Sequence, residues 1–587
     1  MTKKKTPINE LPHWFTQNAE ARLHFLYGET LLNQLMERLI NRLKIEQSSK
    51  APVVNSGTNW TEQDIILITY GDSVQQDDEK PLQTLYEFLS LHLKGSVNSV
   101  HILPYFPYSS DDGFSVIDYK TVDPLLGDWS DIQRIDKDFH LMTDLVINHV
   151  SRENLWFIEY LSKQQPGCNY FIEKPENSDT SMVVRPRSTP VLIPAHTHEG
   201  IRHVWATFGE DQIDVNFSNP DVLFEYIDIL LLYIAKGSRF IRLDAVAFLW
   251  KKAGTRCINL RETHEIVKLL RDIVEVIAPD TVLITETNVP NGENISYFGN
   301  SDEAHMVYQF TLPPLLLHAL HHGNSQYLSQ WAKDMPRPPR NCTYLNFIAS
   351  HDGIGLRPAE GILPEEEVLT LVDAMHEYNG YVSMRTDQFG KESPYEINIA
   401  LFDALKGTYQ GADNYNVPRF LCAHVIMIAL QGIPALYIHS LTASTNNYQG
   451  VEQTGRTRSI NRRKWQYDEL LELLNNPELP HAIVFHELKR LLDIRSKHAA
   501  FHPSASQETI ALGDKLFAFW RISLDQQQRI LVISNISKDT QTIQLPAHPL
   551  AEGSGVWRDL IERTALGKNT RELKLHPYQS AWLEALG

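Results

Sequence analysis

The sequence predicts an α/β fold: a (β/α)8 TIM barrel with an inserted subdomain after strand 3, a helical N-terminal extension and a C-terminal antiparallel β domain. Three observations predict it. Eight short apolar runs alternate with stretches of helical periodicity, a long irregular segment interrupts the third repeat, and β-type runs follow the last repeat. The 587 residues suffice for one barrel of ~250 residues with satellites.

The runs expected to form the barrel are 65–70, 97–103, 140–147, 240–246, 282–284, 306–310, 344–349 and 433–438. The implied units are an extension over 1–60, barrel segments over 61–150, 212–356 and 419–504, an inserted subdomain over 151–211, a capping insertion over 357–418 and a β domain over 505–587. In the extension, leucines recur at helical spacing before a polar linker at 47–59. This predicts helices that pack against the rest of the protein and carry no catalytic residues.

The composition indicates which kinds of partner the protein is not expected to bind. A net charge of -18 argues against general affinity for nucleic acid or an anionic membrane, since both need a cationic surface. The four cysteines show no CxxC spacing, there is no apolar h-region after Met1, and no run of about 18 apolar residues occurs. We therefore expect a cytoplasmic protein without a membrane span. The oligomeric state is left open, a homodimer included.

Carboxylates stand at the ends of three predicted barrel strands. In the run 240–246, the strand period of two places Arg242 and Asp244 on one face. Glu286 ends the next run, and His351 with Asp352 follows the seventh. An adjacent arginine favours the ionised form of Asp244, as a nucleophile requires. Any one of these acids could instead cap a loop, but three at the catalytic face of a barrel favour a site.

Paired carboxyl groups on neighbouring strands suit glycoside chemistry. Retention needs two of them about 5–5.5 Å apart, one attacking the anomeric carbon and one protonating the leaving oxygen. Further candidates are ambiguous alone: His149 could be a structural histidine or a sugar ligand, and Asp111 with Phe114 a sugar clamp or a simple turn. For anions, the candidates are Arg185 and Arg187 in the insertion and Arg458 after the eighth strand; the first two could equally be a solvated turn.

Together these segments resemble glycoside hydrolase family 13, the α-amylase superfamily, and within it the sucrose phosphorylase-like branch. The resemblance covers about residues 60 to 500. The matching motifs are DLVINH at 144–149, RLDAV at 242–246, TE at 285–286, HDGIG at 351–355, HILP at 101–104, GF at 113–114, GTRC at 254–257 and LPPLLLH at 312–318.

The resemblance implies roles for the candidate residues. Asp244 would be the nucleophile, Glu286 the general acid/base and Asp352 the stabiliser of the transition state. The residues framing the glucosyl subsite would be Asp111, His149, Arg242, His351 and Arg458, with Phe208 as an aromatic neighbour. The implied reaction is double displacement through a β-glucosyl-enzyme, which phosphate opens to give α-glucose 1-phosphate.

Details within the branch shift the expected acceptor. The segments 109–119, 285–290, 302–310 and 393–398, with the N-terminal extension, resemble members that act on glucosylglycerate more than those that act on sucrose. We therefore expect phosphorolysis of 2-O-α-glucosylglycerate. The alternative is a sucrose phosphorylase, or another disaccharide phosphorylase or α-glucosidase of the same branch. A hydrolase, a transglucosidase and a catalytically inactive binding barrel are the further rivals, the last disfavoured by three intact carboxylates.

No cofactor is expected. The sequence has neither a Gly-rich phosphate loop nor a dinucleotide-binding fingerprint. Asn148 stands where calcium-binding members of the superfamily use an asparagine, but this branch does not resemble a calcium-dependent group. Because we see no cluster with metal-ligand spacing, we also expect no metal.

Overall fold

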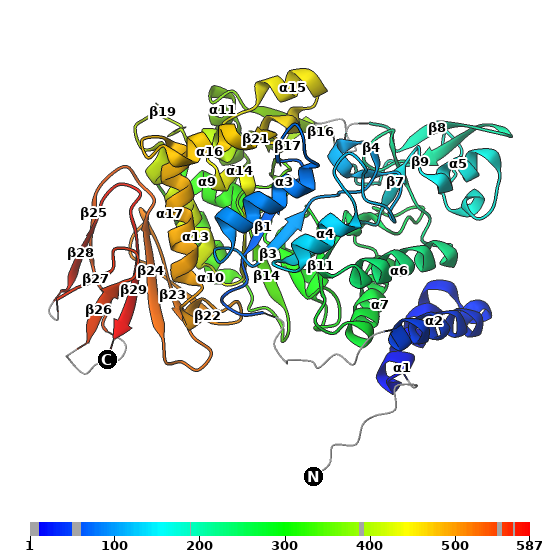
Figure 1. Ribbon diagram of the computed structural model, residues 1–587, viewed down its shortest axis with the longest axis horizontal. Coiled ribbons are helices and arrows are strands. Elements are labelled where there is room, and N and C mark those ends of the chain that lie inside the picture. The colour runs from blue at the N-terminus through cyan, green and yellow to red at the C-terminus, as the bar shows by residue number, and fades with distance from the viewer. Residues whose placement is uncertain are drawn as a thin grey trace, which may run out of the picture.

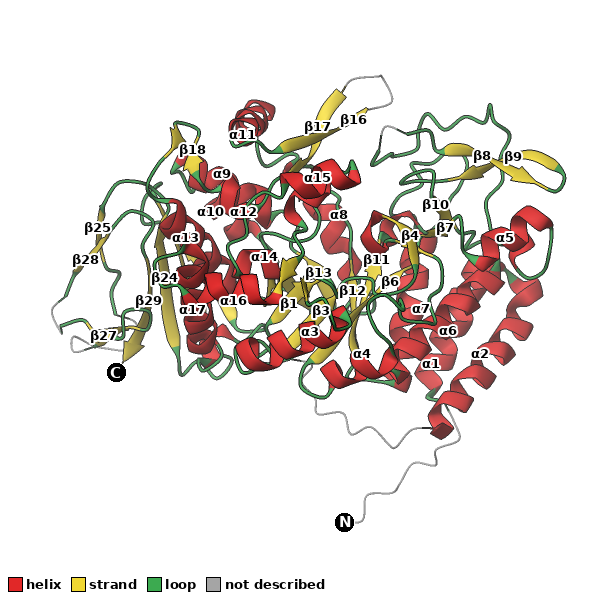
Figure 2. Ribbon diagram, turned by 45° about the horizontal axis from the view of Figure 1, so that its top comes forward, coloured by secondary structure: helices red, strands yellow, loops and turns green. Residues whose placement is uncertain are grey.

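The core of the protein is a closed barrel of eight parallel strands (Figures 1 and 2). In this computed structural model the described residues are 11–49, 60–187, 189–386, 392–548, 555–567 and 570–586. The barrel strands are β1 (Ile66–Thr69), β3 (Ser99–Ile102), β6 (His140–Val146), β11 (Ser238–Asp244), β12 (Val282–Thr285), β13 (Met306–Tyr308), β14 (Thr343–Asn346) and β20 (Ile433–Tyr437). Each falls on one of the eight predicted runs, so the predicted barrel is confirmed.

Helices cover the outside of the barrel because each presents an apolar face to it. They are α3 (Pro81–Phe88), α4 (Trp129–Asp136), α6 (Pro220–Ala235), α7 (Arg261–Ile277), α9 (Leu312–His322), α10 (Gln326–Asp334), α13 (Asn416–Ala429), α16 (Tyr467–Asn475) and α17 (Pro480–Arg495). In α7, Ile266, Leu269, Leu270 and Ile273 recur at helical spacing and are all buried. The start of α6 is fixed by Asn219, whose side chain accepts a hydrogen bond from the Asp221 backbone N–H.

Two insertions stand at one end of the barrel, at the top of both views. The first follows β7 (His149–Ser151) and holds α5 (Leu155–Ser162) with the hairpin of β8 (Leu192–Thr197) and β9 (Gly200–Trp205), before β10 (Gln212–Asp214) returns to pair with β7. The second holds α11 (Glu365–Glu377) and the pair β16 (Tyr381–Thr386) and β17 (Glu392–Asn398). Both insertions therefore stand over the strand ends that carry the predicted carboxylates.

The chain ends in an antiparallel β region beside α13 and α17 (Figure 1). Its six-stranded sheet consists of β22 (Ser506–Ile510), β23 (Leu516–Ile522), β24 (Arg529–Asn535), β29 (Ser580–Leu586), β26 (Val556–Asp559) and β27 (Thr564–Ala565), and β25 (Gln541–Gln544) pairs separately with β28 (Glu572–Leu575). All four cysteines are free thiols. Within the described ranges, no helix has the length and hydropathy needed to cross a bilayer.

The N-terminal extension forms two helices, α1 (His13–Tyr27) and α2 (Glu29–Ser49), beside α7 and α6 (Figure 2). Most of the expected polar linker, from residue 50 onward, lies outside the described residues. In α1, Arg22 is buried, and its Nε lies 2.8 Å from the Asp272 carboxylate of α7, with Glu265 3.3 Å away. In α2, Arg38 pairs with Asp221 at the surface. The extension is thus attached to the barrel by the buried ion pairs of Arg22 and by exposed ion pairs such as that of Arg38.

Substitution of these two arginines should separate their contributions. We expect Arg22→Ala to lower the free energy of unfolding by about 3–5 kcal/mol, because it leaves the Asp272 carboxylate buried without its cation. Arg38→Ala is the matched control and should cost below about 1 kcal/mol, since both partners are solvated. Urea unfolding followed by tryptophan fluorescence measures both. Equal losses in the two variants would contradict the assignment of Arg22 as the anchor.

Candidate active site

Three carboxylates from three barrel strands line one cavity. Asp244 ends β11, Glu286 follows β12 and Asp352 follows β14. β11 pairs with β12 through Leu243 and Thr285, so the next position on each strand is one of the two acids. The Glu286 Oε2 accepts a hydrogen bond of 3.0 Å from the backbone N–H of Ala245, directly after the predicted nucleophile. The register of two parallel strands therefore brings Asp244 and Glu286 to the same cavity.

A buried arginine lies beneath this cavity. The Nη1 of Arg242 lies 2.7 Å from Asp244 Oδ1 and 2.5 Å from Asp144 Oδ1, and the side chains of all three residues are almost fully buried. Asp144 stands opposite Arg242 in the β6–β11 register, and its other oxygen is 2.7 Å from His101 Nε2. Burial raises the pKa of Asp144, but His101 and Arg242 outweigh it and lower the pKa to about 2.

The three predicted catalytic acids differ in their pKa values. Burial raises the pKa of Glu286 to about 7, with Asp244 and Asp352 adding to the rise and Arg242 opposing it. Burial also raises the pKa of Asp244, against the effect of Arg242. Arg242 thus limits the rise at Asp244 rather than depressing its pKa outright. At Asp352, burial is outweighed by Arg458 and Arg462, so its pKa is lowered.

The predicted sugar ligands lie around the same cavity, although two of them make unexpected contacts. Phe114 stacks flat on His351, with ring centroids 4.9 Å apart, so one face of its ring is already covered. The backbone oxygen of Phe114 accepts a hydrogen bond of 2.9 Å from His149 Nε2. Phe208 and Arg187 also line the cavity, whereas Arg185 lies outside its lining. Of the two arginines predicted in the insertion, Arg187 alone faces the carboxylates.

Arg458 lines the cavity, but its guanidinium is already paired with two carboxylates. Its Nη1 lies 2.5 Å from Asp352 Oδ1, and its Nε and Nη2 donate to the two oxygens of Glu396 at 3.0 and 2.6 Å. Glu396 belongs to β17 of the capping insertion and is buried. Arg458 therefore connects that insertion to Asp352, the predicted stabiliser of the transition state, and the sequence did not predict this connection.

A second ion pair lies beside the catalytic cavity, in the lining of a neighbouring one. Asp111 lines it, while the neighbouring Asp112 accepts a hydrogen bond of 2.5 Å from Arg462 Nη1 and faces a separate cavity of about 930 Å³. Asp111 and Asp112 both have left-handed backbone angles, with φ of 55° and 48°. This turn directs the two adjacent carboxylates into different cavities. Asp112 and Arg462 were missed because nothing local links positions 350 residues apart.

Asn148 contacts an ammonium group instead of an open metal site. Lys251 Nζ lies 2.7 Å from Asn148 Oδ1, 2.5 Å from Asp214 Oδ2 and 2.5 Å from the Phe248 backbone oxygen. The Lys251 side chain is only 3% exposed. Three hard oxygens are the kind of donor that calcium prefers, and here a lysine cation fills their centre. No local pattern predicts this contact, since Lys251 follows the barrel strand by several residues.

The chain is similar to proteins of the α-amylase family, in sequence and in fold. A family profile described as the alpha-amylase catalytic domain matches residues 92–353. The glucosylglycerate phosphorylase of Escherichia coli (strain K12) is 42% identical over 562 residues, covering 95% of this chain and 98% of that protein. The glucosylglycerate phosphorylase of Spirochaeta thermophila is 44% identical over 82% of each chain. The crystal structure of a sucrose 6F-phosphate phosphorylase from Thermoanaerobacter thermosaccharolyticum superposes with a TM-score of 0.71 at 23% identity, covering 88% of this chain and 98% of that chain.

The Lys251 cation should be essential to the insertion that it holds. We expect Lys251→Ala to cost about 3–5 kcal/mol of stability, because it leaves Asp214 buried without a cation. Lys252→Ala is the matched control, since Lys252 is exposed and pairs with Glu262 at the surface. Millimolar Ca²⁺ should raise the thermal midpoint of Lys251→Ala and leave that of the unsubstituted protein unchanged. A Lys251→Ala midpoint equal to that of the control would refute this role.

Proposed function

The chain belongs to the α-amylase family, in the branch that contains the glucosylglycerate phosphorylases. From that premise we propose that it catalyses reversible phosphorolysis of 2-O-α-glucosylglycerate, which yields α-glucose 1-phosphate and D-glycerate. The observation that carries the proposal is the 42% identity to glucosylglycerate phosphorylase across 98% of that protein's length, in a chain whose three cavity-lining acids are all present.

Double displacement accounts for the different environments of the two acids. Asp244, ionised, attacks the anomeric carbon while the bond to glycerate breaks and Glu286 gives its proton to the departing oxygen. The resulting β-glucosyl ester on Asp244 is then attacked by a phosphate oxygen. The ester bond breaks, Glu286 takes the proton of the phosphate, and α-glucose 1-phosphate leaves. A pKa of about 7 at Glu286 suits a group that must donate and accept a proton in turn.

An available arginine supports an anionic co-substrate. Two arginines line the cavity, and Arg458 is already paired with Asp352 and Glu396. Within the described part of the chain, no carboxylate lies within ion-pair distance of Arg187, which is near enough to Asp352 to lower its pKa. Phosphate and the glycerate carboxylate reach the cavity in successive half-reactions. We therefore propose that Arg187 binds each of them in turn.

We propose that a single glucosyl unit is the transferred group. The Asp112–Arg462 ion pair lines the larger cavity, next to the turn whose Asp111 lines the catalytic cavity. The free cysteines are consistent with the cytoplasmic location that we propose. Sucrose phosphorolysis is the second candidate, since the sucrose phosphorylase of Streptococcus mutans is 28% identical over 74% of this chain.

Acceptor choice tests the proposal in the synthetic direction. Incubation with α-glucose 1-phosphate and D-glycerate, glycerol, fructose or fructose 6-phosphate should release phosphate fastest with D-glycerate, because a carboxylate pairs with Arg187. Colorimetric phosphate release measures the four rates. Asp244→Asn is the control and should release none with any acceptor while keeping its thermal midpoint. Release with fructose but not with D-glycerate would overturn the acceptor assignment, and release without any acceptor would identify a hydrolase.

The pH profile of phosphorolysis tests the role of Glu286. The acid must be protonated to assist departure of glycerate, so kcat/KM should fall as pH rises above about 7. On the acid side it should fall as Asp244 gains a proton. Glu286→Gln should lower kcat/KM by about 10²–10⁴-fold and remove the alkaline limb. Activity of this variant on α-glucosyl fluoride, whose leaving group needs little protonation, should be reduced far less. An unchanged alkaline limb would exclude Glu286 as the acid.

A further inference from the structure

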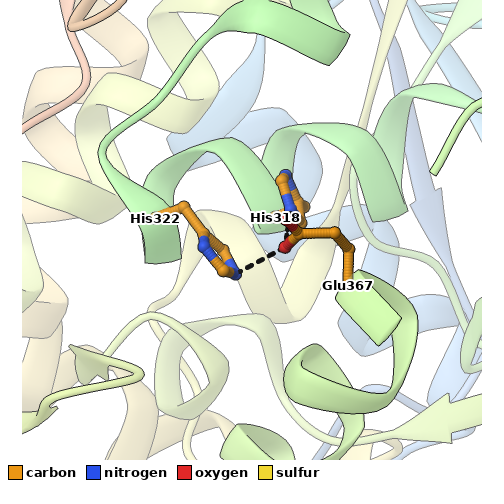
Figure 3. A group of neighbouring side chains, drawn as sticks. All are labelled: His318, His322 and Glu367. Atoms are coloured by element: carbon orange, nitrogen blue, oxygen red, sulfur yellow. Dashed lines mark hydrogen bonds and ion pairs between the residues drawn. The ribbon is translucent and has the colours of Figure 1, made fainter. Parts of the chain in front are cut away.

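We propose that His318, His322 and Glu367 form a binding site for a divalent transition-metal ion, zinc in the first instance, away from the catalytic cavity. Figure 3 shows the two imidazoles from one helix, α9, facing a carboxylate from α11. Their ligand atoms all lie within 4.8 Å of one another. The expectation that the sequence lacks metal-ligand spacing is therefore wrong, because residues 318 and 322 are four apart and share a helix face.

The distances fit the coordination geometry of zinc. Glu367 Oε2 lies 3.0 Å from His318 Nε2 and 3.5 Å from His322 Nε2. With bonds of about 2.0–2.2 Å, two ligands of a tetrahedral zinc ion stand about 3.4 Å apart. Both distances from the carboxylate are thus within a few tenths of an ångström of that value. Two imidazoles and one carboxylate form a donor set that zinc, cobalt and nickel accept.

One of these ligand atoms has no hydrogen-bond partner in the described part of the chain. The Nε2 of His322 is buried and makes only the longer contact of 3.5 Å with the Glu367 carboxylate, at which it points. Aromatic rings fix both histidines: Tyr409 stacks on His322 at 5.1 Å and Tyr327 meets His318 edge-on at 5.5 Å.

The site is closed on one side and open on the other. The His318 side chain is 3% exposed, whereas those of His322 and Glu367 are 21% and 31% exposed. An ion can therefore enter from solvent and keep a water molecule as its fourth ligand. The bound ion would connect α9, which follows barrel strand β13, to α11, the helix of the capping insertion. That insertion also supplies Glu396 to Arg458, so the ion would fasten the cap that borders the catalytic cavity.

Metal titration of the full-length protein tests the inference. After treatment with EDTA and buffer exchange, titration with CoCl2 should produce a visible d–d absorption band at one ion per chain, which ZnCl2 should abolish by displacement. His322→Ala and Glu367→Gln should each weaken binding of Co²⁺ by more than about 10–100-fold. That is the loss typical when a residue that only hydrogen-bonds to a metal ligand is removed, and loss of a ligand should cost more. ZnCl2 should raise the thermal midpoint of the unsubstituted protein and not that of His322→Ala.

An exposed histidine on α11 provides a control substitution for the metal titration. His376 is exposed near the end of the same α11 helix, so His376→Ala should bind Co²⁺ as the unsubstituted protein does. All variants should keep the same phosphorolysis rate in the absence of metal, because none of the three residues lines the catalytic cavity. The inference is overturned if the unsubstituted protein binds Co²⁺ no more tightly than His322→Ala, which includes the absence of binding. Equal losses in His376→Ala would likewise reject it.

Discussion

The catalytic centre depends on the burial of one guanidinium, that of Arg242, between two carboxylates. Placing a cation and two anions at the bottom of a barrel is costly unless each is paired, and Asp144 and Asp244 contact the same nitrogen of Arg242. Asp144 is paired in turn with His101, which leaves Asp244 free to direct its second oxygen at a substrate. Burial raises the pKa of Glu286 to about 7 against the effect of Arg242, and we propose that the two acids have different functions because Asp244 alone of the two contacts that guanidinium among the described ion pairs.

The elements outside the barrel complete the substrate side of the site. The barrel supplies the acids and their buried arginine, but Glu396 comes from the capping insertion and Arg187 from the inserted subdomain. Arg458 carries the connection, because its guanidinium contacts Asp352 on one side and Glu396 on the other. Movement of the cap would therefore change the charge balance at Asp352. The inserted subdomain is held at its base by Lys251, whose ammonium neutralises the buried Asp214.

The barrel and its acids were predictable because their signals are local. An apolar run such as 240–246 identifies a strand whatever surrounds it, and an acid at the end of a barrel strand is a candidate by position alone. The remaining contacts join residues with no sequence relation: Arg458 with Glu396, Arg462 with Asp112, Lys251 with Asp214. Phe114 illustrates the same limit, since it lines the cavity and also stacks on His351, a contact that no local pattern predicts. Spacing identifies chemistry-bearing residues, but tertiary packing decides their partners.

Preference for phosphate over water follows from how charge is distributed in the cavity. In the proposed mechanism Glu286 has lost its proton after the first half-reaction, and it then joins the carboxylates of Asp111, Asp352 and Glu396 in the cavity lining. A further anion such as phosphate would be repelled there unless a cation offsets it, whereas water needs no such help. Arg458 cannot supply the charge because Asp352 and Glu396 already neutralise it. Arg187 is the remaining arginine in the lining, and its interaction with phosphate is stronger inside a half-enclosed cavity than in bulk solvent. We therefore propose that one guanidinium, that of Arg187, decides whether the glucosyl-enzyme is opened by phosphate or by water.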